Sequence, residues 1–213
     1  PTADFVRASG KCAECHALLQ YYIVHASALS HNARKGVNCL DCPQPADSQD
    51  KLDHHGFVIS KHLTAGNCRS CHEQEYQEFL RSRHAAQSWA AVYGEKGLRP
   101  EQVSLSEQYQ PGATRRPPHP FVIAEGASAM TSGCEQCHSI GKPNADGTIG
   151  TCTACHSRHT SSVELARLPS TCGQCHMGPD HSQIEIYNES KHGVRFAAQR
   201  NILNLKAPPK LLT

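Results

Sequence analysis

Twelve cysteines, all of them in Cys-x-x-Cys pairs, constrain this chain more than any other feature. The pairs are Cys12/Cys15, Cys39/Cys42, Cys68/Cys71, Cys134/Cys137, Cys152/Cys155 and Cys172/Cys175. In all but the second pair a histidine follows directly, and these are His16, His72, His138, His156 and His176. Cys-x-x-Cys-His is the attachment signature of a c-type haem. On a helical turn, residues three apart share a face, so both thiols reach one porphyrin and the histidine lies under its iron.

Two other uses of paired cysteines explain the sequence less well. Zinc ribbons share one metal between two Cys-x-x-Cys units, and secreted proteins close local disulfides. Neither explains why a histidine follows the second cysteine so regularly, or why the chain has 15 histidines among 213 residues. We therefore expect about six covalently bound c-type haems.

The overall composition suits a core built largely of porphyrin. Hydrophobic residues make up 38% of the chain and aromatic residues 6%, which is little for an ordinary core of this size. We expect a mainly α-helical multihaem cytochrome with much irregular loop. A net charge of +2 without a basic run gives no sign of nucleic-acid binding, and no apolar stretch is long enough to span a membrane. Covalent haem attachment takes place outside the bacterial cytoplasm, which predicts a periplasmic location.

The spacing of the cysteines divides the chain into three parts. Residues 1–93 and 133–213 hold three Cys-x-x-Cys units each, and residues 94–132 hold no cysteine. The prolines of residues 94–132 predict a connecting loop, and the polar residues 44–66 are also expected as loop. The apolar spacing between Tyr76 and Tyr93 predicts one long helix, which begins at the third unit and ends at Gly94.

The second unit lacks its histidine, because Pro43 follows Cys42. Two thiols can still hold a porphyrin, but proline offers no ligand to iron. Either another histidine, such as His54 or His55, takes the fifth position, or this haem is modified or absent, or the sequence is in error here.

A recurring Ser-x-His pattern with a basic middle residue supplies candidate sixth ligands. It ends at His62, His84, His159 and His192. Two methionines are too few for general Met/His ligation, so bis-histidine haems are expected. His84 is too far along a helix from His72 to bind the same iron, so the sixth ligands cross between haems. The histidines expected to add ligands to the five proximal ones are His31, His55, His84, His159 and His192.

Turnover requires one iron whose sixth position is open, with a proton acceptor above it. Asp180 and His181 are the best candidates, because a histidine beside a carboxylate is suited to proton transfer near neutral pH. His181 is only five residues beyond His176, so we expect it over a neighbouring haem, and we choose the one held by His138. An axial role for His181, with Asp180 as its orienting partner, fits the residues equally well.

Three segments resemble the octahaem hydroxylamine oxidoreductase family, and the likeness covers nearly the whole chain. They are NCRSCHEQEYQEFLRSRHAAQSWAAVYGEKG, GCEQCHSIGKPNADGTIGTCTACHSRH and ARLPSTCGQCHMGPDHSQIEIYNESKHG, of which the GPDH and ESKHG motifs are the most specific. The resemblance implies a periplasmic homotrimer that oxidises hydroxylamine at its fourth haem, here on Cys134, Cys137 and His138. It also implies that Asp180 and His181 accept protons in the distal pocket, while the other haems pass electrons to a c-type cytochrome.

Two departures from the family pattern bear on the direction of the reaction. The family carries eight haem units, so this chain resembles its N-terminal six-haem portion and is expected to be shorter than its relatives. The tyrosine that cross-links the family's catalytic porphyrin from a neighbouring subunit would fall beyond Thr213. The second departure is Pro43. Without the cross-link the family tends toward reduction of nitrite or hydroxylamine. Hydrazine oxidation is a further alternative, and a non-catalytic electron carrier or filament subunit is the alternative of another class.

Overall fold

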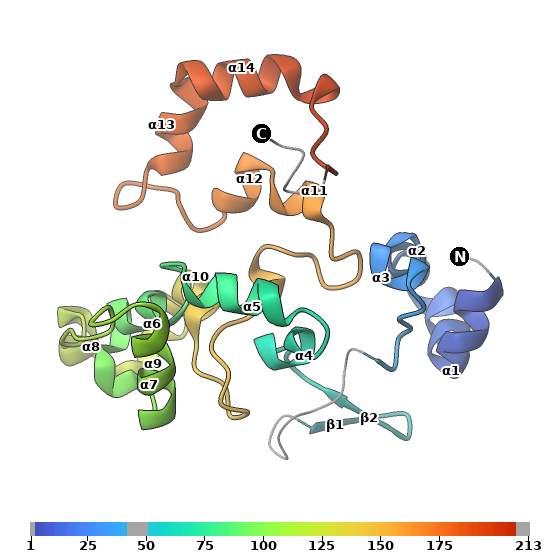
Figure 1. Ribbon diagram of the computed structural model, residues 1–213, viewed down its shortest axis with the longest axis horizontal. Helices are drawn as coiled ribbons and strands as arrows, with labels where there is room; N and C mark the ends of the chain where they lie inside the picture. The colour runs from blue at the N-terminus through green and yellow to red at the C-terminus, as the bar shows by residue number, and fades with distance from the viewer. Residues whose placement is uncertain (1–2, 42–50, 208–213) are drawn as a thin grey trace.

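The computed structural model describes residues 3–41 and 51–207. Cys42, Pro43 and Thr213 therefore lie outside the described residues. The expected mainly α-helical fold with much irregular loop is confirmed (Figure 1). No helix of the described residues is long and apolar enough to cross a membrane.

The secondary structure consists of short helices and one hairpin, with η marking a 3-10 helix. In chain order the elements are α1 (Ala3–Leu19), α2 (Tyr21–Leu29), α3 (His31–Arg34), β1 (Lys51–His54), β2 (Phe57–Ser60), α4 (Ala65–Arg69), α5 (Glu73–Leu80), α6 (Ala86–Tyr93), η2 (Glu95–Gly97), α7 (Pro100–Tyr109), α8 (Pro120–Glu125), α9 (Ala127–Met130), α10 (Glu135–His138), η3 (Ser139–Gly141), η4 (Cys152–Ala154), α11 (Val163–Ala166), α12 (Pro169–Cys172), α13 (Gln183–Glu189), α14 (Lys191–Gln199) and η5 (Arg200–Ile202).

An antiparallel hairpin replaces part of the loop expected for residues 44–66. Strands β1 and β2 pair with Lys51 opposite Ser60 and His54 opposite Phe57. The two turn residues, His55 and Gly56, both have positive φ, at 54° and 84°, as a tight two-residue hairpin turn requires. The hairpin therefore fixes His54 at the end of a strand and His55 in the turn.

The long helix expected up to Gly94 is wrong, because the structure has two helices, α5 and α6. The chain leaves the helix at residues 81–85 and re-enters it at Ala86, whereas Gly94 ends α6 as expected, with a φ of 67°. At the break between α5 and α6, the chain lies close to the segment that contains Gly141. A Cβ atom on Gly141 would collide with the carbonyl oxygen of Ala85, so η3, which follows His138 directly, lies against the break that carries His84.

The expectation of a loop for residues 94–132 is also wrong, since α7, α8 and α9 lie within it. Pro100 and Pro120 occupy the first turn of α7 and α8. Proline is favoured there because the missing N–H has no partner within the helix anyway and the fixed φ is already helical. Two of the prolines that indicated a loop therefore begin helices.

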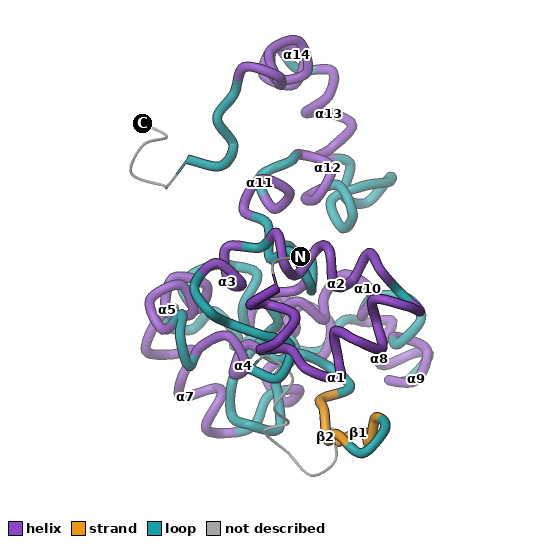
Figure 2. Tube along the Cα trace, turned by 90° about the vertical axis from the view of Figure 1, so that its right-hand side faces the viewer, coloured by secondary structure: helices purple, strands orange, loops and turns teal. Residues whose placement is uncertain are grey.

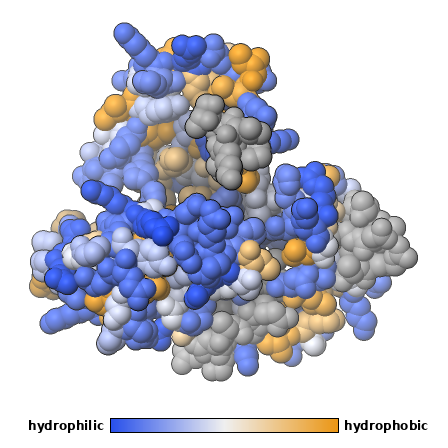
Figure 3. Space-filling view, in the orientation of Figure 1, coloured by the Kyte–Doolittle hydropathy of each residue, from blue (hydrophilic) through white to orange (hydrophobic). Residues whose placement is uncertain are grey.

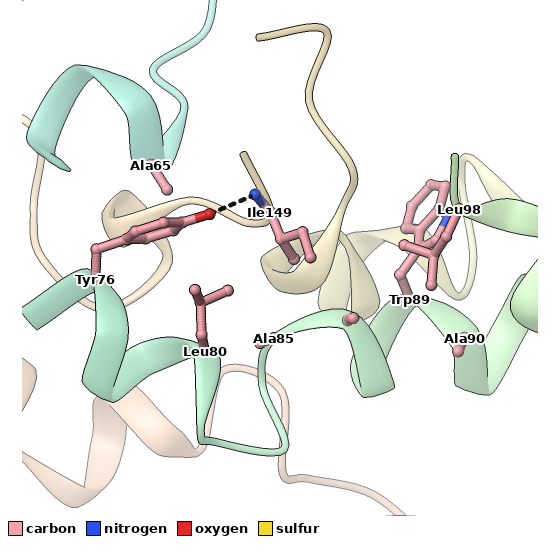
Figure 4. Packing of buried hydrophobic residues seen from close by; sticks show 9 residues of the cluster. Ala65, Tyr76, Leu80, Ala85, Trp89, Ala90, Leu98 and Ile149 are labelled. Carbon is pink, nitrogen blue, oxygen red and sulfur yellow. Dashed lines mark hydrogen bonds between the residues drawn. The ribbon is translucent and has the colours of Figure 1, made fainter. Parts of the chain in front are cut away.

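A small hydrophobic core joins α5 and α6 to the segment around Ile149 (Figure 4). Tyr76, Leu80, Trp89, Leu98 and Ile149 are its largest members. The backbone N–H of Ile149 donates to the Tyr76 hydroxyl at 3.1 Å. Many large apolar side chains remain exposed elsewhere, and Figure 3 shows apolar groups scattered over the surface. A core this small agrees with a protein whose haems supply further apolar volume.

Candidate haem sites

The Cys-x-x-Cys-His units have the helical turn that their spacing predicts. In four of them the histidine N–H donates to the carbonyl oxygen of the first cysteine, at 2.9 Å in the units of His72, His138 and His156 and 3.0 Å in the unit of His176. The unit of His16 lies within α1. All eleven described cysteines are free thiols, as attachment to a porphyrin requires. Among residues 3–41 and 51–207 no cluster of three or more His, Cys, Asp or Glu residues is arranged to hold a metal ion.

Thiols from different units lie close together and connect the units in space. Burial and a hydrogen bond with Cys137 raise the pKa of Cys175 to about 11. A hydrogen bond with Cys152, together with burial, raises the pKa of Cys68. Burial raises the pKa of Cys155, and nearby Cys172 raises it further. The units that begin at residues 134, 172, 152 and 68 are therefore neighbours in that order.

The first two units form a separate neighbouring pair. Cys39 packs against the buried Ala13 and Val24, and burial followed by the proximity of Cys39 raises the pKa of Cys12. Burial lowers the pKa of His159, and the charges of Arg158 and then of His16 lower it further. His159 thus lies near the first unit, and its segment links this pair to the unit of Cys152.

Among the predicted haem cysteines that are exposed, Cys15 and Cys71 do not take part in these contacts. Both side chains are exposed, and within the described part of the chain the structure brings neither thiol to a cysteine of another unit. Sγ of Cys71 accepts the hydroxyl of its neighbour Ser70 at 4.0 Å. A thiol on the outer side of a helical turn is covered by the porphyrin that it would hold and not by protein side chains. The roles predicted for Cys15 and Cys71 therefore rest on their spacing alone, since protein packing does not enclose either thiol.

Several histidine pairs have the separation that one haem iron requires. An imidazole nitrogen lies about 2 Å from its metal and a ring centroid about 1 Å beyond, so two rings on opposite sides of one iron have centroids about 6 Å apart. The ring centroids of His84 and His176 are 6.0 Å apart, and those of His138 and His181 are 6.4 Å apart with an interplanar angle of 74°.

His84 faces a proximal histidine of another unit. Burial lowers its pKa, and the nearby His176 lowers it further, which keeps the imidazole neutral and its lone pair available to a metal near neutral pH. The structure therefore brings His84 to the haem unit of His176 and not to that of His72.

The proximal histidine of the fourth unit is held by a hydrogen bond that selects its tautomer. Nδ1 of His138 lies 2.7 Å from the carbonyl oxygen of Ser88 in α6, and the Ser88 hydroxyl donates to the carbonyl oxygen of His138 at 3.2 Å. Because the acceptor at Nδ1 is a carbonyl, Nδ1 carries the proton and Nε2 is left for iron. His16 has a comparable contact, with Nδ1 3.1 Å from Oε1 of Gln20.

A network of polar side chains fixes Glu135 within the fourth unit. The Tyr93 hydroxyl donates to Oε1 of Glu135 at 2.5 Å, and Lys142 lies 3.6 Å from the other carboxylate oxygen. Burial raises the pKa of Tyr93, and the hydrogen bond to Glu135 raises it further. Tyr93 therefore remains a neutral donor that holds Glu135 within the Cys134–His138 turn.

Asp180 and His181 lie on a tight turn between α12 and α13. Gly178 has a φ of 79°, and its carbonyl oxygen accepts the N–H of His181 at 3.1 Å. The His181 ring lies near that of His138, with 6.4 Å between the centroids, and the haem of His138 is the neighbour that the sequence favours. Asp180 is exposed and makes no hydrogen bond or ion pair with a described residue, so it does not orient His181 through a direct contact.

Three other predicted ligands, His31, His55 and His192, have no ring contact with a proximal histidine among the described residues. His31 is an exposed residue at the start of α3, and His192 lines a cavity near α14. His55 makes an edge contact with His54, with ring centroids 4.8 Å apart. It is His54 that stacks on His16, with ring centroids 5.8 Å apart and an interplanar angle of 17°. The sequence named His54 only as a substitute ligand for the second unit, because the hairpin that carries it to His16 was expected as loop.

A cavity of about 870 Å³ lies beside the third and fifth units. Asn67 and Thr153, which neighbour Cys68 and Cys152, are among its walls, as are Lys61 and Arg158. Cationic side chains suit the carboxylates of haem propionates. Lys61 and Arg158 thus suit the propionates of a haem held by either unit, whose cysteines are not themselves among the cavity walls.

Three comparisons with known proteins agree with these features. Residues 35–211 match the family described as seven times multi-haem cytochrome CxxCH. A probable nitrite reductase-hydroxylamine oxidoreductase fusion protein of Kuenenia stuttgartiensis is 30% identical over 176 residues, which cover 80% of this chain and 16% of that protein.

Two solved structures resemble this fold. A hypothetical multiheme protein matches with a TM-score of 0.69 and 22% identity, over 97% of this chain and 52% of the other. A chain of a reducing HAO-like protein complex of Kuenenia stuttgartiensis matches with a TM-score of 0.58 and 25% identity, over 98% of this chain and 40% of the other. The chain thus spans about half or less of the length of each of these relatives.

Proposed function

This chain belongs to the family of multihaem CxxCH cytochromes, and we propose that it oxidises hydroxylamine to nitric oxide or nitrite at the haem of Cys134, Cys137 and His138. The observation that carries the proposal is the approach of His181 to the proximal histidine of this unit, with 6.4 Å between the ring centroids of His181 and His138. A curated relative whose name includes hydroxylamine oxidoreductase supports the choice of substrate.

The haem would supply an iron that binds the substrate nitrogen and accepts its electrons. Oxidation of hydroxylamine to nitric oxide releases three electrons and three protons, so the site needs a base for the protons as well as an electron acceptor. His138 would hold the iron through Nε2, with its orientation fixed by Ser88. His181, exposed on its turn and opposite His138, would take protons from the N–H and O–H groups of the substrate and pass them to solvent.

Electrons would leave through the neighbouring units. The thiol contacts connect the fourth unit to the sixth through Cys137 and Cys175, the sixth to the fifth through Cys172 and Cys155, and the fifth to the third. Bis-histidine irons such as the one between His84 and His176 would carry charge without binding substrate. A c-type cytochrome acceptor, a homotrimer and a periplasmic location complete the proposal.

Reduction of nitrite or hydroxylamine at the same iron is the second candidate function. The similarity to a chain of a complex described as reducing favours it. The same His181 would then donate protons instead of accepting them.

Steady-state assays in both directions test the proposal. The haem-loaded protein is mixed with hydroxylamine and oxidised cytochrome c, or with nitrite or hydroxylamine and a reduced viologen, and hydrazine is assayed in parallel. We expect hydroxylamine-dependent reduction of cytochrome c. Turnover only in the assays with reduced viologen would show that the protein is a reductase and not an oxidase. Inactivity in every assay would contradict an enzymatic role.

A further inference from the structure

Helix α6 carries an aromatic pair beside the fourth haem unit that the proposed turnover does not use. The rings of Trp89 and Tyr93 have centroids 4.5 Å apart and an interplanar angle of 36°. Helix α6 packs against α10 and η3, and Figures 1 and 2 show α10 on the same side of the molecule as α8 and α9. The carbonyl oxygen of Ser88, directly before Trp89, contacts Nδ1 of His138 at 2.7 Å. The proximal imidazole is therefore joined by a hydrogen bond to the backbone that leads into this pair.

The Tyr93 hydroxyl has a proton acceptor within the fourth unit itself. It donates to Oε1 of Glu135 at 2.5 Å, and Glu135 lies between Cys134 and Cys137 in the sequence. The Glu135 side chain is only 16% exposed, and its other carboxylate oxygen lies 3.6 Å from Nζ of Lys142. Because the carboxylate is held from both sides, the hydroxyl has a fixed partner that can take its proton.

Trp89 has no comparable acceptor. Its Nε1 donates to the carbonyl oxygen of Gly97 at 2.9 Å, and a carbonyl is a far weaker base than a carboxylate. Nζ of Lys142 lies 5.4 Å from the centroid of the indole ring, and a positive charge at that position disfavours loss of an electron from the ring. The indole is buried, and Figure 4 shows it beside Leu98. Of the two rings, Tyr93 is therefore the one that can remain oxidised.

Oxidation of Tyr93 couples the loss of an electron to the loss of a proton. Burial, and then the hydrogen bond to Glu135, raise the pKa of Tyr93, so the hydroxyl keeps its proton near neutral pH. The proton must then leave together with the electron, and a base within hydrogen-bond distance is required to receive it. The Glu135 carboxylate meets this requirement.

We propose that Tyr93 is a redox-active tyrosine that returns an electron to the fourth haem after a peroxide has oxidised this haem. As the O–O bond of hydrogen peroxide breaks, two electrons from the haem and two protons from solvent convert the peroxide to two molecules of water. Tyr93 then replaces one of these electrons. Its O–H bond breaks and the proton passes to Oε1 of Glu135, which leaves a neutral tyrosyl radical and a protonated carboxyl group. The inference rests on the open iron of the proposed function, but not on hydroxylamine as the substrate.

Rapid freezing of the ferric, haem-loaded protein after mixing with hydrogen peroxide tests the proposal. We expect the haem absorption bands to change and an organic radical to appear in the electron paramagnetic resonance spectrum. The radical signal should narrow when the protein is grown with ring-deuterated tyrosine. Tyr93→Phe should remove the signal and prolong the life of the oxidised haem, while its intact mass shows the full haem content.

Two further variants separate proton transfer from a merely structural role. Glu135→Gln keeps the shape of the partner but removes the base, so it should slow formation of the radical by about 10²-fold, within the usual contribution of a positioned proton acceptor. Tyr76→Phe is the matched control, because Tyr76 is a buried tyrosine whose hydroxyl accepts the N–H of Ile149 and does not face a carboxylate. It should give the wild-type signal.

The haem bands and the radical signal fail separately, which distinguishes this inference from the proposed function. A change of the haem bands without a tyrosyl signal would overturn the inference alone, as would a tyrosyl signal that Tyr93→Phe leaves unchanged. Haem bands that hydrogen peroxide does not alter would contradict the open iron, and the proposed function would then fail together with the inference.

Discussion

Replacing His181 by alanine is expected to lower the rate of hydroxylamine oxidation by about 10²–10⁴-fold, the usual contribution of a positioned general base. Its ring centroid lies 6.4 Å from that of His138, so its loss removes the proton acceptor beside this haem and leaves the cysteines untouched. Haem content, measured from the intact mass, should not change. The rate is followed as cytochrome c reduction at saturating hydroxylamine.

Two further variants sharpen the test of His181. Asp180→Asn should cause a smaller loss, because the carboxylate makes no hydrogen bond with a described residue and so does not hold the imidazole directly. His119→Ala should retain full activity, since that histidine caps α8. A His181→Ala protein as active as the wild type would show that the assignment of the distal base is wrong.

Replacing His84 by alanine is expected to convert one low-spin iron to high spin. His84 is the ring opposite His176, with 6.0 Å between the centroids, and no methionine is needed to explain the sixth position. Removing it leaves the haem attached to Cys172 and Cys175 but opens one axial site. Electron paramagnetic resonance of the oxidised protein should show one additional high-spin ferric signal, and the intact mass should show the full haem content.

Added imidazole should reverse the effect of the His84 substitution, because it fills the vacated position. Arg83→Ala, at the neighbouring exposed position between α5 and α6, is the matched control and should retain the wild-type spectrum. An unchanged spectrum for His84→Ala would assign the sixth position of the His176 haem to another residue.

The sequence predicts the features of this chain that depend on neighbouring residues. The turn of each Cys-x-x-Cys-His unit requires only a hydrogen bond from the histidine to the first cysteine, and a glycine at Gly94 is enough to end α6. The small protein core also follows, because few apolar residues are available and porphyrins supply the rest.

The features that the sequence did not predict depend on contacts between distant segments. The break between α5 and α6 coincides with the approach of Gly141 to Ala85. These residues are far apart in the sequence, so no pattern of neighbouring residues indicates the contact. A proline such as Pro100 is common both in loops and in the first turn of a helix, so the residue alone does not distinguish the two structures. His54 reaches His16 only because a hairpin forms. The sequence favours the pairing of His181 with His138 on other grounds. His181 is only five residues beyond His176, so it is expected over a neighbouring haem and not over the haem of His176.

The central claim is that the iron held by His138 has an open position beneath His181. The separation of 6.4 Å between their ring centroids also fits direct ligation of the iron by His181. In that arrangement the haem would transfer electrons but would not bind substrate. Electron paramagnetic resonance of the resting oxidised wild type distinguishes the two arrangements. We predict one high-spin ferric signal, which shifts when hydroxylamine is added, among low-spin bis-histidine signals. A spectrum with low-spin signals alone, unchanged by hydroxylamine, would contradict the proposal of an enzyme.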